Sequence, residues 1–300
     1  MLRTGRRARR HPGVRSRDTE PIGHPRPRER ASWIAWSPTK AALLVALAVG
    51  VAVTLAPGNG AAGDIASGFV RAVRHLTTPS SRAGQAFSGT PPVGALFTTS
   101  AGGLNQHFCT ATVVHSPAGD LVITAAHCVT GTQGTLDFVP GYDQGSEPYG
   151  VWTVTKVYVD QAWSSSSSQN DDFAFVRVSR PGSSVPIEDV TGAERLDTDL
   201  PASRELVQVI GYPNATNQPV TCQNPIRQPM AGQLEFDCDG YTDGTSGGPF
   251  LSEIDQVTGQ GLVIGVIGGY QQGGDSPQVS YSPVLGANAA ALYRVAVAGG

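Results

Sequence analysis

The sequence lacks the closely spaced ligand pairs of a structural zinc site. It contains no Cys-x-x-Cys pair, and none of its six histidines lies beyond His127. Zinc sites usually take two of their ligands from such a pair. We therefore expect no metal ion, and because no nucleotide or other cofactor motif is visible, we expect no cofactor.

Aromatic residues are scarce, at 7% of the 300 residues, whereas glycine (37) and proline (22) are abundant. This composition favours many short strands joined by turns over long helices. The hydrophobic content of 40% is sufficient for a packed core. We expect an all-β protein without internal repeats.

No apolar run of bilayer length is evident. The run 41–56 has 16 uncharged residues, fewer than the ~20 of a membrane span. It follows a basic leader, residues 1–40, and precedes small residues at 60–63, an order typical of an export signal with a cleavage site after Ala62. Segment 41–62 is therefore interpreted as a signal peptide or an uncleaved signal anchor, with a buried helix as the weaker alternative. The first two alternatives predict a protein that is secreted or anchored at the cell surface.

A net positive charge is found in the leader and not in the rest of the chain. Residues 1–40 carry eleven basic residues against three acids, a net charge of +8, whereas the remainder of the chain nets −11. A basic head of this kind is compatible with nucleic-acid binding. Export explains it better, so we expect no nucleic-acid partner and a membrane contact only through the apolar segment.

Residues 63–92 are rich in small residues and proline and are expected to form a linker or a short pro-segment. Beyond them, short strand patterns recur, at 151–159, 173–178, 206–210 and 262–267. The segment 181–201 begins and ends with proline and divides this region into two halves, 93–195 and 196–300. Each half has the size of a small barrel or sandwich.

Ser246 is surrounded by glycines in the sequence Gly244-Thr245-Ser246-Gly247-Gly248-Pro249. Glycine permits a sharp turn and a close approach of the backbone to a substrate, and successive N–H groups can then point into one concavity. The N–H groups of Gly244 and Ser246 would stabilise an oxyanion there. Taken alone, the motif fits a glycine-rich turn with an incidental serine equally well.

A serine nucleophile needs a base and a group that orients the base. His127 follows the apolar run 121–123 and two small alanines, and it precedes Cys128. Asp171 and Asp172 directly precede the apolar sequence Phe173-Ala174-Phe175-Val176, where one carboxylate can be buried if it is hydrogen-bonded. The other aspartate is expected to be an exposed loop acid.

The four cysteines, Cys109, Cys128, Cys222 and Cys238, all follow the apolar run. An even number in an exported chain predicts two disulfides, and three pairings are possible.

The sequences around His127, Asp172 and Ser246, in that order, resemble those of chymotrypsin-like serine peptidases, with bacterial glutamyl endopeptidases among the similar members. The resemblance extends over residues 93–300. It implies two antiparallel six-stranded β-barrels with the active site between them. It also implies the disulfide Cys109–Cys128, and with it Cys222–Cys238.

The resemblance assigns a role to each residue of the three motifs. His127 is the general base and acid, Asp172 rather than Asp171 orients it, and Ser246 is the nucleophile. Gly244 and Ser246 donate the oxyanion-hole N–H groups. At position 245, activated relatives have an aspartate that pairs with a new N-terminal ammonium, and this chain has Thr245. We therefore expect that no cleavage-generated N-terminus is needed.

The substrate pocket is assigned to Gly240, Gly268, Gly269 and Tyr270. The position that carries an acid in trypsins is Gly240, and no histidine is available to bind an acidic side chain as in glutamyl endopeptidases. The glycines and apolar residues of 265–270 favour an uncharged side chain unless loop lengths bring in Asp239 or Asp243.

The sequence thus predicts a monomeric serine endopeptidase, a hydrolase that acts on proteins or peptides. The alternative is a peptidase-fold binding module that does not cleave.

Overall fold

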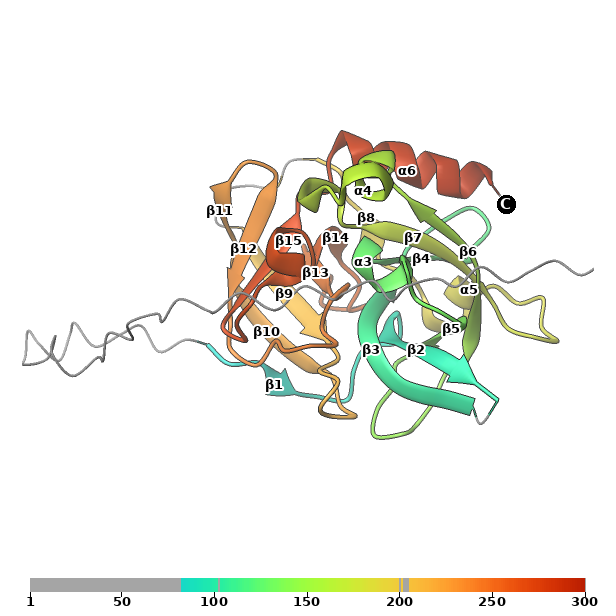
Figure 1. The fold of residues 1–300 in the computed structure, drawn as a ribbon. Coiled ribbons are helices and arrows are strands. Elements are labelled where there is room, and N and C mark those ends of the chain that lie inside the picture. Colours follow the sequence, from blue (N-terminus) through green and yellow to red (C-terminus); the bar gives the residue numbers. More distant parts are fainter. Residues whose placement is uncertain (1–81, 102, 200, 202–204, 300) are drawn as a thin grey trace, which may run out of the picture. The chain divides into compact units, whose positions relative to one another are not determined.

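The computed structural model describes residues 82–101, 103–199, 201 and 205–299 (Figure 1). Residues 1–40, the segment 41–62 and most of 63–92 lie outside these residues, so the expectations for them stay predictions. Within the described part, no helix is long and apolar enough to cross a membrane.

The first half is a closed barrel of six antiparallel strands in the order β2-β3-β4-β7-β6-β5. The strands are β2 (Val93–Ser100), β3 (Gly103–Val113), β4 (Leu121–Thr124), β5 (Thr135–Pro140), β6 (Trp152–Val159) and β7 (Ala174–Ser179). The strands predicted at 151–159 and 173–178 are therefore confirmed as β6 and β7.

The second half consists of two sheets (Figure 1). One has the order β1-β10-β9-β13-β14-β8 and the other the order β11-β12-β15. The strands are β1 (Gln85–Ala86), β8 (Arg195–Leu196), β9 (Leu206–Gly211), β10 (Val220–Pro225), β11 (Arg227–Met230), β12 (Gln233–Asp237), β13 (Pro249–Ser252), β14 (Leu262–Val266) and β15 (Val279–Pro283). The strands predicted at 206–210 and 262–267 are confirmed as β9 and β14.

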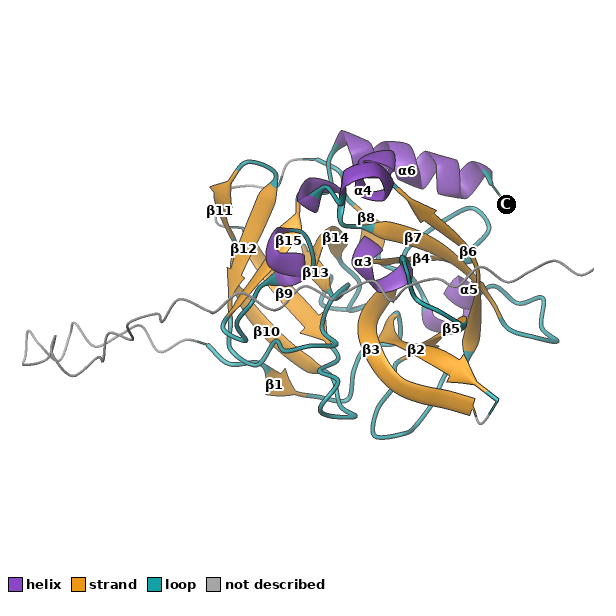
Figure 2. Ribbon diagram, viewed as in Figure 1, coloured by secondary structure: helices purple, strands orange, loops and turns teal. Residues whose placement is uncertain are grey.

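Strands dominate the structure, and the all-β class is confirmed (Figure 2). Two short edge strands depart from the simple pattern. β8 pairs parallel with β14, because the chain that connects the halves runs along the edge of the second sheet. β1 precedes the first barrel but pairs with β10, Gln85 opposite Thr221, so the chain crosses the second half before it enters the first.

The helices are short except for the last one. They are α3 (Ala126–Val129), α4 (Gln161–Ser166), α5 (Ile187–Thr191) and α6 (Ala287–Ala298), with 3-10 turns η2 (Gln169–Asp171) and η3 (Tyr270–Gly273). α6 follows the second half but packs on the first. Its Tyr293 ring lies 5.7 Å from Phe175 of β7. Arg177 donates to the carbonyl oxygens of Ala296 and Val297, which have no partner within the helix.

One hydrophobic cluster joins the two halves. Phe97 and Tyr142 from the first half pack with Ile210 and Tyr212 from the second, and the rings of Tyr142 and Tyr212 lie 6.4 Å apart. Interiors of this kind are close-packed, so a displacement of one side chain forces its neighbours to move as well. Residues contributed by the two halves are therefore held in a fixed relation to each other.

Glu194 also connects the halves. Its backbone N–H donates to Val113 O (3.0 Å) in the first barrel, and its buried carboxylate accepts from Gly261 N in the second half. Burial raises the pKa of Glu194 to about 7, against the smaller opposing effect of the Gly261 N–H. A carboxyl group with a folded-state pKa above its unfolded value favours folding when it is protonated.

We predict that the contribution of Glu194 to the stability of the protein is lost as pH rises from about 4.5 to about 7, the interval between its unfolded and folded pKa values. In Glu194→Gln this contribution disappears, and the variant is more stable than wild type above pH 7 by up to about 3 kcal/mol. Urea unfolding at pH 5 and pH 8 measures the difference. An equal difference between the two proteins at both pH values contradicts the prediction.

Candidate active site

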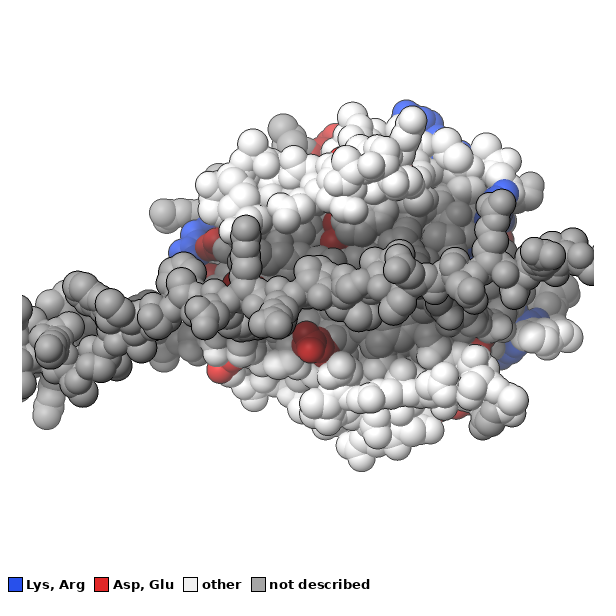
Figure 3. All heavy atoms as spheres, in the orientation of Figure 1, with Lys and Arg blue, Asp and Glu red and all other residues white. Residues whose placement is uncertain are grey.

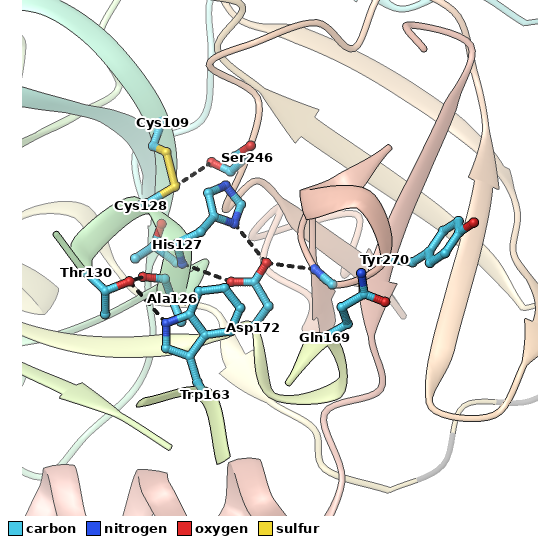
Figure 4. Close-up of polar contacts among 12 residues, drawn as sticks. Cys109, Ala126, His127, Cys128, Thr130, Trp163, Gln169, Asp172, Ser246 and Tyr270 are labelled. Carbon is cyan, nitrogen blue, oxygen red and sulfur yellow. Dashed lines mark hydrogen bonds and ion pairs between the residues drawn. A yellow bond between two sulfur atoms is a disulfide. The ribbon is translucent and has the colours of Figure 1, made fainter. Parts of the chain in front are cut away.

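His127 and Asp172 form a hydrogen-bonded pair (Figure 4). His127 lies in α3, directly after β4, and Asp172 lies between η2 and β7. The Nδ1 atom of His127 lies 2.8 Å from Asp172 Oδ2, and the His127 backbone N–H donates to Asp172 Oδ1 at 2.9 Å. A carboxylate accepts only, so Nδ1 carries the proton and Nε2 of the neutral ring is free to accept one.

Asp172 is fully buried, and the cost of burying its charge is offset by hydrogen bonds. A third donor is the backbone N–H of Gly269, 2.9 Å from Oδ2. Asp171 is also buried, contrary to the expectation of an exposed loop acid. It accepts from Ser168 Oγ (2.6 Å) and Asn288 Nδ2 (2.7 Å), so it ties η2 to α6 and does not contact His127.

Ser246 lies on the side of the His127 ring opposite Asp172 (Figure 4). Its backbone carbonyl accepts from Thr110 N at 2.7 Å and lies 3.8 Å from Cys128 Sγ. Since a disulfide sulfur has no hydrogen to donate, the second contact is packing. Ser246 and His127 line one cavity of about 600 Å³, and within the described residues the Ser246 hydroxyl has no hydrogen-bond partner.

The residues before Ser246 form a β-turn. Thr245 N donates to Thr242 O (3.1 Å), and Gly244 occupies the third position of the turn with φ of +96°, where glycine is favoured. Asn214 N donates to Asp243 O at 2.7 Å. In a trans peptide the N–H points opposite to the carbonyl, so this bond directs the Gly244 N–H away from Asn214. Within the described residues, neither Gly244 N nor Ser246 N donates a hydrogen bond.

The glycines after Ser246 are required by the packing of the protein itself. A Cβ atom on Gly247 would lie 2.2 Å from Thr110 O and from Thr124 Oγ1, and one on Gly248 would lie 2.2 Å from Ile210 O. These distances are shorter than any real contact. Both glycines therefore allow the serine loop to approach the first barrel and β9, a role that the sequence pattern did not distinguish from access for a substrate.

None of the four residues expected to form the substrate pocket lines the cavity. A Cβ on Gly268 would contact Asp172 O, and Gly269 donates to Asp172, so both support the His127–Asp172 pair. Tyr270 packs edge-on against Tyr281. Gly240 donates to the side chain of Asp239.

The cavity is instead lined by the loop around Asn214, residues 241–243, 245 and 246, and the segment 271–277. Apart from His127, its charged side chains are Asp243 and Asp275, both exposed acids. Gln271 Nε2 donates to Asp275 Oδ2 at 2.8 Å, and Gln271 and Gln272 both have positive φ, +53° and +55°. The sequence did not predict that Asp275 lines the cavity, because Asp275 belongs to none of the three motifs and lies far from them along the chain.

Both disulfides, Cys109–Cys128 and Cys222–Cys238, are present. Cys109 and Cys128 lie beside His127, and these three side chains form the group of potential metal ligands found among the described residues. Because both sulfurs are engaged in a disulfide, no thiolate is available to bind a metal ion.

Comparison with known proteins identifies the family. The model of the trypsin-like peptidase domain matches residues 109–259, so the chain belongs to this family. No curated protein matches.

Solved structures show the same fold. The protease Anisep from Arthrobacter nicotinovorans is 24% identical with a TM-score of 0.61, over 72% of this chain and 100% of that one. The thermostable serine protease AL20 from an extremophilic microorganism is 24% identical with a TM-score of 0.59, over 70% and 99%. A Glu endopeptidase is 16% identical with a TM-score of 0.58, over 73% and 98%. The fold is therefore chymotrypsin-like.

We predict that Gly247→Ala abolishes formation of the site, because the new methyl group overlaps the backbone of the first barrel as well as straining a residue with φ of +82°. Gly131→Ala is the matched control. Gly131 has φ of +79° but nothing within 4 Å of its Cβ position, so only the backbone strain of about 1–2 kcal/mol remains. Thermal unfolding compares the two variants, and equal losses contradict the prediction.

Proposed function

We propose that the protein is a serine endopeptidase that cleaves peptide bonds through an acyl-enzyme intermediate. The observation that carries the proposal is a His127–Asp172 pair whose histidine shares a cavity with Ser246. Among the described residues, neither the Ser246 hydroxyl nor the backbone N–H groups of Gly244 and Ser246 form a hydrogen bond. The family membership supports the same reaction.

Each group has a role in the reaction. Ser246 Oγ attacks the carbonyl carbon of the scissile bond, and its proton moves to His127 Nε2. The carboxylate of Asp172 stabilises the imidazolium that forms. The N–H groups of Gly244 and Ser246 donate to the oxyanion of the tetrahedral intermediate. His127 then protonates the leaving amine. A water molecule gives its proton to His127 and attacks the acyl carbon, and Ser246 Oγ leaves and takes that proton from His127.

Exposed polypeptide outside the cytoplasm is the proposed substrate. Two disulfides are typical of an oxidising compartment, in agreement with the export signal expected at 41–62. On the face shown in Figure 3, the charged side chains of the described residues that remain visible are scattered among uncharged ones. The protein is proposed to act as a monomer.

The reactivity of Ser246 is testable with a fluorophosphonate probe on the full chain. We predict labelling at Ser246 that is lost in Ser246→Ala and His127→Ala. Asp172→Asn lowers the labelling rate by roughly 10⁴-fold, the effect of this change in the chymotrypsin-type triad. Asp171→Asn is the matched control and stays within a few-fold of wild type, because Asp171 does not contact His127.

A folded, disulfide-bonded wild type that resists the probe would contradict the endopeptidase proposal. That result would favour a peptidase-fold protein that binds without cleaving.

The acids of the cavity indicate a preference for substrates with a cationic side chain. This revises the expectation of an uncharged preference, because the loops bring Asp243 and Asp275 to the cavity and leave Asp239 outside it. Asp275→Asn and Asp243→Asn are each predicted to lower the ratio of cleavage at lysine or arginine to cleavage at leucine by roughly two- to five-fold, the effect of an exposed ion pair. High salt weakens the preference in wild type.

A peptide library measures this ratio, with Asp239→Asn as the control outside the cavity. If the ratio of cleavage at lysine or arginine to cleavage at leucine is unchanged in both Asp243→Asn and Asp275→Asn, the proposed preference for a cationic side chain is wrong.

A further inference from the structure

Thr110 of β3 connects the first barrel to the serine loop of the second half. It is fully buried. Its backbone N–H donates to Ser246 O (2.7 Å), its hydroxyl donates to Gly244 O (3.0 Å), and the hydroxyl oxygen accepts from Tyr212 N (2.9 Å). One side chain therefore bonds to the turn before Ser246 and to the end of β9.

These bonds orient the peptide groups of the turn. Thr110 holds the carbonyl of Gly244, and Asn214 N holds the carbonyl of Asp243, so the peptide planes on both sides of Gly244 are determined. Gly248 N donates to Thr245 O at 2.9 Å, which determines the plane that contains the Ser246 N–H. Since each N–H points opposite to the carbonyl of its own peptide group, both free N–H groups have fixed directions.

Thr245 stabilises the same turn from within. It is 3% exposed, and its hydroxyl donates to Thr242 O at 2.8 Å, parallel to the bond from its own backbone N–H. Because position 245 is buried, an aspartate there would need a buried positive charge as its partner. A neutral hydroxyl satisfies the turn without any ion pair.

We propose that the hydroxyl of Thr110 is a positioning group for catalysis: it holds the Gly244–Thr245 peptide group, which lies between the two oxyanion-binding N–H groups, and so fixes from across the barrel interface the turn that carries both of them. This inference rests on the proposed endopeptidase function. Thr110 contacts neither the substrate nor the reacting atoms, and it acts through the orientation of the Gly244 peptide. The turn then keeps its shape without a new N-terminus.

A purely structural role for a buried threonine is the competing explanation, and the chain offers a matched control. Thr112 lies two residues further along β3 and is equally buried, but among the described residues its hydroxyl has no hydrogen-bond partner. Replacing either residue with valine preserves shape and removes a hydroxyl. Thr110→Val breaks two hydrogen bonds, whereas Thr112→Val breaks none.

The experiment compares Thr110→Val, Thr110→Ser and Thr112→Val in the full chain. Three quantities are measured: the rate of fluorophosphonate labelling, kcat and KM for p-nitrophenyl acetate, and amide hydrogen exchange of peptides that contain Tyr212. Thr110→Val is expected to lower the labelling rate and kcat by about 10- to 100-fold, with KM changed less than about three-fold. Exchange at Tyr212 becomes faster, Thr110→Ser stays within about three-fold of wild type, and Thr112→Val matches wild type.

The outcomes separate the two proposals. Labelling and turnover of Thr110→Val at the wild-type rate overturn the positioning role, as does an equal loss in Thr112→Val. Thr110→Ser as slow as Thr110→Val has the same consequence, because serine retains the hydroxyl. A wild type that is not labelled contradicts the proposed function instead, and the exchange of Tyr212 still reports whether the Thr110 hydrogen bond exists.

Discussion

The whole site depends on the close approach of the serine loop to the first barrel. Gly247 and Gly248 remove the side chains that would block this approach, and Thr110 then forms hydrogen bonds with Ser246 O and Gly244 O. The serine and the histidine belong to different halves, so neither half contains a site by itself. The hydrophobic cluster shared by the halves and the placement of α6 on the first barrel keep these contacts in register.

Burial of charge is handled differently at two positions. The carboxylate of Asp172 accepts hydrogen bonds from His127 and from Gly269 N, and these bonds offset the cost of burying it. Glu194 has one backbone donor, and burial raises its pKa to about 7. The first arrangement would stabilise an imidazolium next to the acid, as the proposed reaction requires. The second is the basis of the predicted pH dependence of stability at the junction between the halves.

The predictions from the sequence succeeded where short segments carry the information. The strand patterns led to β6, β7, β9 and β14. His127 and Ser246 line one cavity, and Asp172 is hydrogen-bonded to His127. The lining of the cavity was less predictable, because it comes from loops separated by dozens of residues. The backbone has positive φ at Gln271 and Gln272, and positive φ is usually predicted from glycine. The sequence therefore carried no signal for the bend at these two residues.

The sequence by itself determined the all-β class, the three motifs, and the presence of Thr245 where the activated relatives have an aspartate. Each of these is a local property of residue type and spacing. Only the tertiary structure decided that Asp171 is buried against α6 and not exposed, that Asp243 and Asp275 line the cavity, and that Thr110 supports Gly244. The physical reason is that hydrogen bonds and cavities join atoms across the barrel interface, and those distances exist only once the two halves have packed together.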